Sequence, residues 1–269
     1  MNRTLTWSYG GGTQSIAIAI LVGEGKLPRP EYIGIADTSR EKSSTWKYHK
    51  EVIKPYLEGI GLEVDIIPHK PYAYVDLYSH QGKILMPMFT STGMMRTYCS
   101  SEWKRYVLRR RMRELGYSPK NPVTTWIGMS KDEFKRMKPS GVKWMEYTYP
   151  LIYDYPLERE GCRQLVIDRG FPAPPKSSCW MCPHMSDAEW LEMRQDHPDD
   201  FEKAIKVEEE LQKKEEVYLF WAGVSLRDVA DVSDEKWFDM VSSLRKRSSS
   251  KMDGQLAFDD FCDSGFCFV

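Results

Sequence analysis

A glycine-rich loop between a strand and a helix is the feature that most constrains the fold of this chain. Residues 5–7 are β-prone, residues 8–15 contain three consecutive glycines, residues 16–23 are small and apolar, and residues 32–36 predict a second strand. Strand, loop, helix and strand in this order are typical of a parallel sheet wrapped by helices. We therefore expect an α/β protein with helices on both faces of its sheet.

The alternation continues along the first half of the chain and then stops. We expect a helix over 45–59, a strand over 62–67, a basic helix over 102–115 and a strand over 123–129, followed by short helices over 131–137, 160–170, 187–197 and 199–216. These patterns predict a sheet domain over 1–135, a mainly helical region with several cysteines over 136–241, and a flexible tail over 242–269.

Composition excludes several classes of protein. The 269 residues contain 38 Lys and Arg against 39 Asp and Glu, and this near-neutral balance leaves room for a local basic patch. No apolar run approaches the ~20 residues that a membrane helix needs, and the N-terminus carries no export signal. Six cysteines are too few for a disulfide scaffold. We expect a soluble cytoplasmic protein in which clustered thiols indicate metal binding or redox chemistry.

The loop itself predicts an anion-binding site. Glycine lets the backbone approach oxygen atoms closely, and hydroxyl groups and helix N–H groups then bind phosphate. No Gly-Lys-Ser/Thr follows, and the spacing is not Gly-x-Gly-x-x-Gly, so neither a Walker loop nor a dinucleotide fingerprint is indicated. The candidate phosphate-binding residues are Ser8, Gly10, Gly11, Gly12, Thr13, Gln14 and Ser15.

Several motifs together resemble one enzyme family. Residues 8–15 are similar to the pyrophosphate loop (PP-loop) of the adenine-nucleotide α-hydrolase superfamily, with Thr13-Gln14 departing from the usual Ser-Gly-Gly-x-Asp-Ser form. Residues 36–41 resemble the Asp-Thr-Gly-x-Glu of phosphoadenosine phosphosulfate (PAPS) reductases. Further matches are Arg96-Thr97-Tyr98-Cys99, Ile127 to Glu133 with Arg136-Met137, and Cys179-Trp180-Met181-Cys182-Pro183. The whole, over about residues 5–205, looks like the PAPS-reductase-like branch often found in phages and mobile elements.

The resemblance implies a Rossmann-like sheet that binds ATP or a PAPS-like adenosine nucleotide. The loop would hold the phosphates, Asp37 would lie near the base or ribose, and Gly128 would complete the site. ATP-using members adenylate a substrate oxygen, release pyrophosphate and let a nitrogen or sulfur nucleophile displace AMP, whereas PAPS reductases attack a sulfonucleotide with a thiolate. Both chemistries stay open, and Arg96 and Arg136 are the candidate catalytic cations in either.

The C-x-x-C of Cys179 and Cys182 has the spacing that lets two thiolates reach one metal ion or cluster. The other two ligands of a four-thiolate site would be Cys99 and Cys162, since each lies beside a motif that resembles the family pattern. Such a set suits a [4Fe–4S] cluster, which the resemblance favours, or zinc. Unligated thiols or a redox pair are the remaining alternatives.

Cys262 and Cys267 lie apart, near the end of the expected tail. In PAPS reductases a cysteine from a mobile C-terminal tail attacks the nucleotide, so the resemblance makes Cys267 a candidate nucleophile. The tail lacks the Glu-Cys-Gly-x-His pattern of those enzymes. Sulfur relay, metal binding and simple packing of the tail are the alternatives.

The expected partners follow from charge and family resemblance. The basic helix over 104–113 fits a nucleic-acid substrate or phosphate handling equally well. A sulfur donor or reductant protein and a second copy of the chain, in a homodimer, are further expected partners. Two other classes remain open: a non-catalytic nucleotide-sensing or DNA-associated binding protein with a structural metal site, and a metal-stabilised structural protein without nucleotide affinity.

Overall fold

The computed structural model describes residues 3–221 and 223–249, which form two compact units. The first, called the sheet unit, contains the described residues up to Asp76 together with Cys99–Ser178. The second, called the helical unit, contains Leu77–Tyr98 and the described residues from Cys179 onward.

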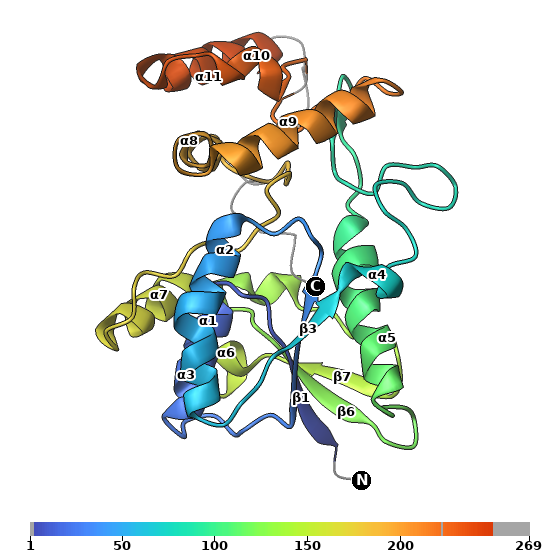
Figure 1. Cartoon of the computed structure of the whole chain (residues 1–269), viewed down its shortest axis with the longest axis vertical. Coiled ribbons are helices and arrows are strands. Elements are labelled where there is room, and N and C mark those ends of the chain that lie inside the picture. Colours follow the sequence, from blue (N-terminus) through green and yellow to red (C-terminus); the bar gives the residue numbers. More distant parts are fainter. Residues whose placement is uncertain (1–2, 222, 250–269) are drawn as a thin grey trace. The chain divides into compact units, whose positions relative to one another are not determined.

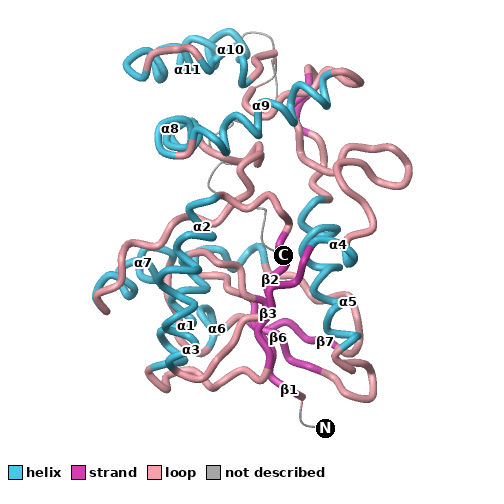
Figure 2. The backbone as a smooth tube through the Cα atoms, viewed as in Figure 1, coloured by secondary structure: helices cyan, strands magenta, loops and turns pink. Residues whose placement is uncertain are grey.

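Five parallel strands form the sheet, in the order β3-β2-β1-β6-β7 (Figures 1 and 2). They are β1 (Thr4–Ser8), β2 (Tyr32–Asp37), β3 (Asp65–Pro68), β6 (Val123–Ile127) and β7 (Met145–Thr148). The expected α/β class with a parallel sheet is confirmed. The fifth strand, β7, was not expected. Its four residues, Met-Glu-Tyr-Thr, are too few to show a clear alternation of apolar and polar side chains, and only the first of them is buried.

Helices cover both faces of this sheet. They are α1 (Thr13–Gly23), α2 (Ser43–Tyr48), the π-helical turn η1 (His49–Ile53), α3 (Lys54–Gly59), α4 (His69–Tyr72), the π-helical turn η2 (Ser101–Arg105), α5 (Tyr106–Glu114), the 3₁₀ turn η3 (Lys131–Arg136), α6 (Pro150–Tyr153) and α7 (Arg159–Asp168). α1 packs against α7 over one face, and α5 packs over the other (Figure 1).

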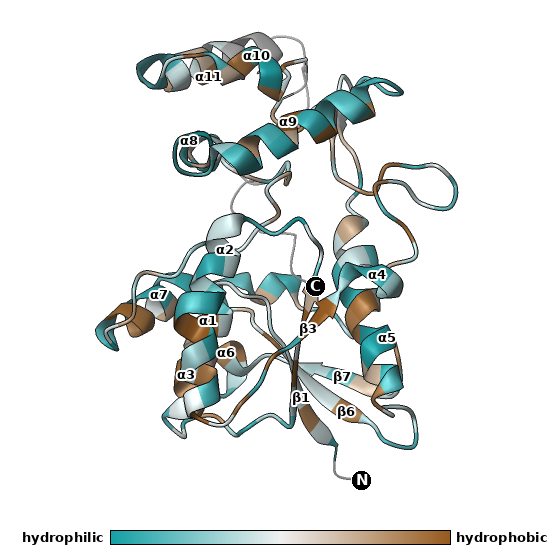
Figure 3. Cartoon of the chain, viewed as in Figure 1, coloured by the Kyte–Doolittle hydropathy of each residue, from teal (hydrophilic) through white to brown (hydrophobic). Residues whose placement is uncertain are grey.

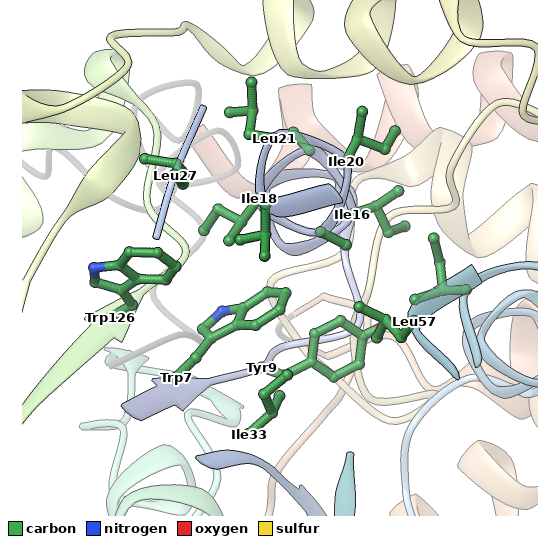
Figure 4. Close-up of a cluster of buried hydrophobic side chains, with 14 of the residues drawn as sticks. Trp7, Tyr9, Ile16, Ile18, Ile20, Leu21, Leu27, Ile33, Leu57 and Trp126 are labelled. Atoms are coloured by element: carbon green, nitrogen blue, oxygen red, sulfur yellow. The ribbon is translucent and has the colours of Figure 1, made fainter. Parts of the chain in front are cut away.

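The core beneath α1 follows from the strand register. Trp7 of β1 lies opposite Ile33 of β2 and Trp126 of β6, so these three side chains form one row across the sheet. Figure 4 shows this row, with Tyr9 beside Trp7, facing the apolar side chains of α1. Residues 13–22 of α1 are all buried, because the sheet covers one side of the helix and α7 covers another.

The two units divide the chain differently from the expected boundaries. β7 and α7 lie beyond residue 135 but belong to the sheet unit, since β7 pairs with β6 and α7 packs on α1. Residues 77–98 belong to the helical unit, through contacts such as the backbone pairing of Phe89 with Tyr218. Residues 242–249, expected in a tail, lie within α11 (Asp234–Ser249), and the later part of that tail lies outside the described residues.

The helical unit contains a short antiparallel pair, β4 (Phe89–Thr90) and β5 (Gly93–Met94), with α8 (Asp187–Asp196), α9 (Pro198–Gln212), α10 (Leu226–Ala230) and α11. Its core is aromatic, with Trp190 and Trp237 each against Phe220. In Figure 3, α9 shows alternating polar and apolar bands, as expected for a helix with one buried face. Within the described ranges, no helix combines the length and hydropathy that a membrane crossing requires.

Glu208 of α9 is a fully buried carboxyl that holds the helical unit together. Its oxygens accept hydrogen bonds from the N–H groups of Leu219 and Leu226, both at 2.6 Å. Burial raises the pKa of this carboxyl from 4.5 to about 7, against the lowering effect of the two N–H groups. The folded state therefore retains a proton over this pH window that the unfolded state releases. The contribution of this group to the free energy of unfolding should fall as pH rises from 4.5 to about 7, by on the order of 3 kcal/mol.

This pH dependence can be measured against Glu208→Gln, whose side chain does not titrate. We expect the difference in free energy of unfolding between wild type and variant, from urea titrations, to favour wild type most at low pH and to shrink toward pH 7. The other titrating groups are common to both proteins and cancel. A difference that grows with pH would show that the carboxyl is ionised throughout.

Candidate functional site

The carboxyl ends of β1, β2 and β6 bring the candidate phosphate-binding residues to one edge of the sheet. The glycine loop follows β1, Asp37 ends β2, and Gly128 follows β6. Strand β1 lies between β2 and β6, so the strand order reverses there. Open parallel sheets bind ligands in the crevice outside this kind of reversal. The candidate residues therefore lie at a single edge of the sheet.

The loop after β1 has the backbone form of an anion cradle. Ser8 ends the strand, and Gly11 has φ +70°, a conformation that favours glycine. The N–H of Gly10 donates to Ser15 Oγ at 2.9 Å, which folds the loop over the start of α1. No side chain of the described residues caps this helix at Gly12. The N–H groups of its first turn, which have no intrahelical partners, are therefore suited to an anion.

Contacts with the loop after β6 hold this cradle in place. A Cβ at Gly128 would lie 3.0 Å from Ser15 Oγ, so glycine permits the close approach of the two loops. The side-chain amide of Gln14 donates to Glu133 Oε2 at 2.9 Å and to Ser130 Oγ at 3.3 Å. Ser130 and Glu133 form the capping box of η3. Gln14 thus joins the two loops.

The two predicted catalytic arginines have different surroundings. Arg136 forms an ion pair with Glu133 and is held beside the Gln14 network, with 12% of its side chain exposed. Arg96 belongs to the helical unit, where its side chain is exposed. Arg136 is therefore the arginine that the sheet unit itself places near the glycine loop.

A second network, not identified from sequence, also contacts the loop. The Ser177 hydroxyl lies 2.8 Å from the carbonyl oxygen of Gly10 and 2.5 Å from Glu41 Oε1. Lys104 Nζ donates to Glu41 Oε2 at 3.2 Å, and only 6% of the Glu41 side chain is exposed. Lys104 comes from η2, and π-helical turns are frequent at functional sites. This network places one ammonium and one carboxylate beside the glycine loop.

The chain after β2 adopts a strained turn at this same edge. Asp37 Oδ1 accepts the N–H of Ser39 at 2.7 Å, and Ser39 has φ +58°, which is uncommon for a residue with a side chain. Asp37 is half-buried, so part of its carboxylate faces outward. This position at the end of β2 agrees with the expectation that Asp37 lies beside a bound nucleotide.

The four cysteines predicted to bind a metal are divided between the two units. Cys162 is fully buried in the apolar cluster between α7 and α1, and burial raises the pKa of its thiol to about 12. Cys99 precedes η2 and α5, which cover the opposite face of the sheet from α7. Cys179 and Cys182 belong to the helical unit. Within the described chain, no group of three or more metal-ligating side chains is formed.

Cys162 therefore occupies a core position, packed among apolar side chains of α1 and α7. The expected [4Fe–4S] or zinc site at Cys99, Cys162, Cys179 and Cys182 stays a prediction, and Cys267 lies outside the described residues.

The position of Cys162 leads to a labelling prediction. In reduced protein freed of metal by a chelator, iodoacetamide should modify Cys179, which is partly exposed, and leave Cys162 unmodified. After unfolding in urea both thiols should react. Peptide mass spectrometry reports each site separately, and modification of both cysteines at equal rates in the folded protein would contradict the core assignment.

Neither protein-family models nor curated proteins gave a match when compared with this chain. The resemblance to PAPS-reductase-like enzymes thus remains a prediction that rests on the motifs, and the geometry of the sheet edge is independent support for phosphate binding.

Proposed function

We propose that this chain is an enzyme that binds an adenine nucleotide at the glycine loop and cleaves ATP between its α- and β-phosphates. The observation that carries the proposal is the start of α1, where no side chain of the described residues caps the free N–H groups. It follows the left-handed Gly11 and contacts the loop after β6, at the point where the strand order reverses. The choice of adenosine as the nucleoside comes from the resemblance of residues 8–15 and 36–41 to the PP-loop family.

The described residues supply the parts that such a reaction needs. Backbone N–H groups of the loop would hold the phosphates, and Lys104 and Arg136 supply cations on either side of it. A substrate oxygen would attack the α-phosphorus and expel pyrophosphate. A sulfur or nitrogen nucleophile would then displace AMP. PAPS reduction would instead require a nucleophilic thiol, for which the resemblance offers Cys267, outside the described residues.

Binding and turnover can be tested separately. Isothermal titration with ATP, PAPS and GTP should show that the adenine nucleotides bind and GTP does not. Exchange of labelled pyrophosphate into ATP, with magnesium and an acceptor RNA present, should then report adenylation of an acceptor oxygen. Sulfite release from PAPS would instead establish the reductase. Adenine-nucleotide binding without pyrophosphate exchange or sulfite release would favour the nucleotide-sensing alternative, and no binding of either adenine nucleotide would overturn the proposal.

A further inference from the structure

The outward side of α5 and the preceding turn carries a dense group of arginines. Arg105, Arg109 and Arg110 lie around Tyr106 on this side, and Arg113 follows one turn later; this side is called the arginine face below. The opposite side of the helix, with Val107, Leu108 and Met112, is buried against the sheet. The arrangement follows from helical spacing, since residues three and four apart share one side of a helix.

Aromatic rings and backbone carbonyls hold these arginines in place. The guanidinium groups of Arg105, Arg109 and Arg110 lie 5.1, 5.9 and 5.8 Å from the centre of the Tyr106 ring. Arg110 also lies 3.7 Å from the ring centre of Tyr74, and Arg113 lies 5.6 Å from that of Trp144. The side chains of Arg109 and Arg110 donate to the carbonyl oxygens of Ser140 and Tyr72. The positive charges are therefore ordered before any ligand arrives.

No carboxylate of the described residues forms an ion pair with the four arginines. Arg111, on the same helix but outside the arginine face, pairs with both Asp65 and Glu114. The buried Nε atoms of Arg105 and Arg109 have no hydrogen-bond partner in the part of the chain that the structure describes. The three guanidinium groups around the Tyr106 ring repel one another, and the chain as a whole has a formal charge of −1. A bound polyanion would relieve this repulsion.

The dimensions of the face suit a nucleic-acid strand. Arg105 and Arg113 are separated by about 12 Å along the helix, which spans about three to four phosphates at the spacing of one DNA strand. Tyr74 is 66% exposed and offers a ring on which a base can stack. The helical segment begins beside the Lys104–Glu41 pair, so a strand lying along α5 would lead to the nucleotide edge of the sheet.

We infer that the arginine face binds a nucleic acid through its phosphate backbone, with Tyr74 stacking on a base. A further step rests on the proposed function: this nucleic acid would be the substrate whose oxygen is adenylated before a sulfur or nitrogen nucleophile displaces AMP. The binding itself does not require ATP cleavage, so the two can fail independently.

The test compares two double variants that remove equal charge. Arg105→Gln with Arg113→Gln changes the arginine face, and Arg163→Gln with Arg169→Gln removes two exposed charges from the α7 region of the same unit. Glutamine preserves helix propensity, and thermal unfolding confirms that both variants fold. The readout is fluorescence anisotropy of a labelled single-stranded RNA and the same DNA sequence, in salt from about 50 to 200 mM.

We expect wild-type protein to bind with an affinity that falls steeply as salt rises. The arginine-face variant should bind at least about tenfold more weakly than wild type. The slope of its log binding constant against log salt concentration should be smaller by about 1 to 2, while the control variant stays within about twofold of wild-type affinity. The inference is overturned by absence of binding at low salt, by equal loss in both variants, or by inorganic polyphosphate competing as well as RNA of equal charge. Titration of ATP into the same proteins shows separately whether the proposed nucleotide site works.

Discussion

Replacing Gly11 with alanine is expected to weaken ATP binding by about 100-fold or more. The backbone of Gly11 has φ +70°, and an added Cβ would lie 3.2 Å from Thr45 Cγ2. The loop must then change its conformation, which would turn N–H groups away from the phosphates. Loss of two hydrogen bonds to a charged group, at about 1.5 kcal/mol or more each, corresponds to that factor.

Gly25→Ala is the matched control for this prediction. Gly25 also has φ +70°, but an added Cβ there meets no atom within 4 Å, and the residue lies beyond the end of α1. Both variants should lose about 1 to 2 kcal/mol of stability from the strained conformation, and only Gly11→Ala should lose ATP affinity. Isothermal titration gives the affinities and urea unfolding gives the stabilities. Equal ATP affinity in the two variants would remove the loop from the binding site.

Glu41→Gln is expected to lower the free energy of unfolding by about 3 kcal/mol. The Glu41 carboxylate is almost fully buried, and it faces the Lys104 ammonium at 3.2 Å and the Ser177 hydroxyl at 2.5 Å. An amide keeps the shape of the side chain but removes the charge that the ammonium faces. The variant should also loosen the Ser177 contact with Gly10 and so weaken nucleotide binding.

A double-mutant cycle with Lys104→Met separates the ion pair from general packing. The double variant should recover part of the loss, because it leaves no buried carboxylate or ammonium uncompensated. Glu160→Gln is the control, since its ion pair with Arg163 is exposed and should contribute less than about 1 kcal/mol. Additive losses in the cycle, measured by urea unfolding, would show that Glu41 and Lys104 do not act as a pair.

Local patterns predicted much of the sheet unit. The strand, glycine loop and helix at residues 4–23 follow from alternation, from a run of small apolar residues and from glycines that permit a tight turn. The basic helix near 102–115 was also expected, and its hydrophobic side fits the core of the sheet. In contrast, β7 was missed because a four-residue edge strand carries too little periodicity to separate it from a loop.

Cys162 shows why a candidate site is harder to predict than a fold. Its place before the C-x-x-C suggested a fourth metal ligand, yet α7 packs that side chain against α1 in an apolar cluster. Sequence spacing gives the distance along the chain, whereas burial depends on which side of the helix meets its neighbour. The same limit hid Ser177, which contacts Glu41 across 136 positions of sequence.

The sequence by itself determined the α/β class, the glycine loop at the end of the first strand and the cluster of arginines on one helix, because these depend on neighbouring residues and their helical or strand period. Only the tertiary structure decided that Gln14 joins the loops after β1 and β6, that Glu41 links Lys104 to Ser177, and that Cys162 lies in the core. Each of these relations depends on parallel strands that bring distant loops to one edge and on helices that bury one side, which no local pattern specifies.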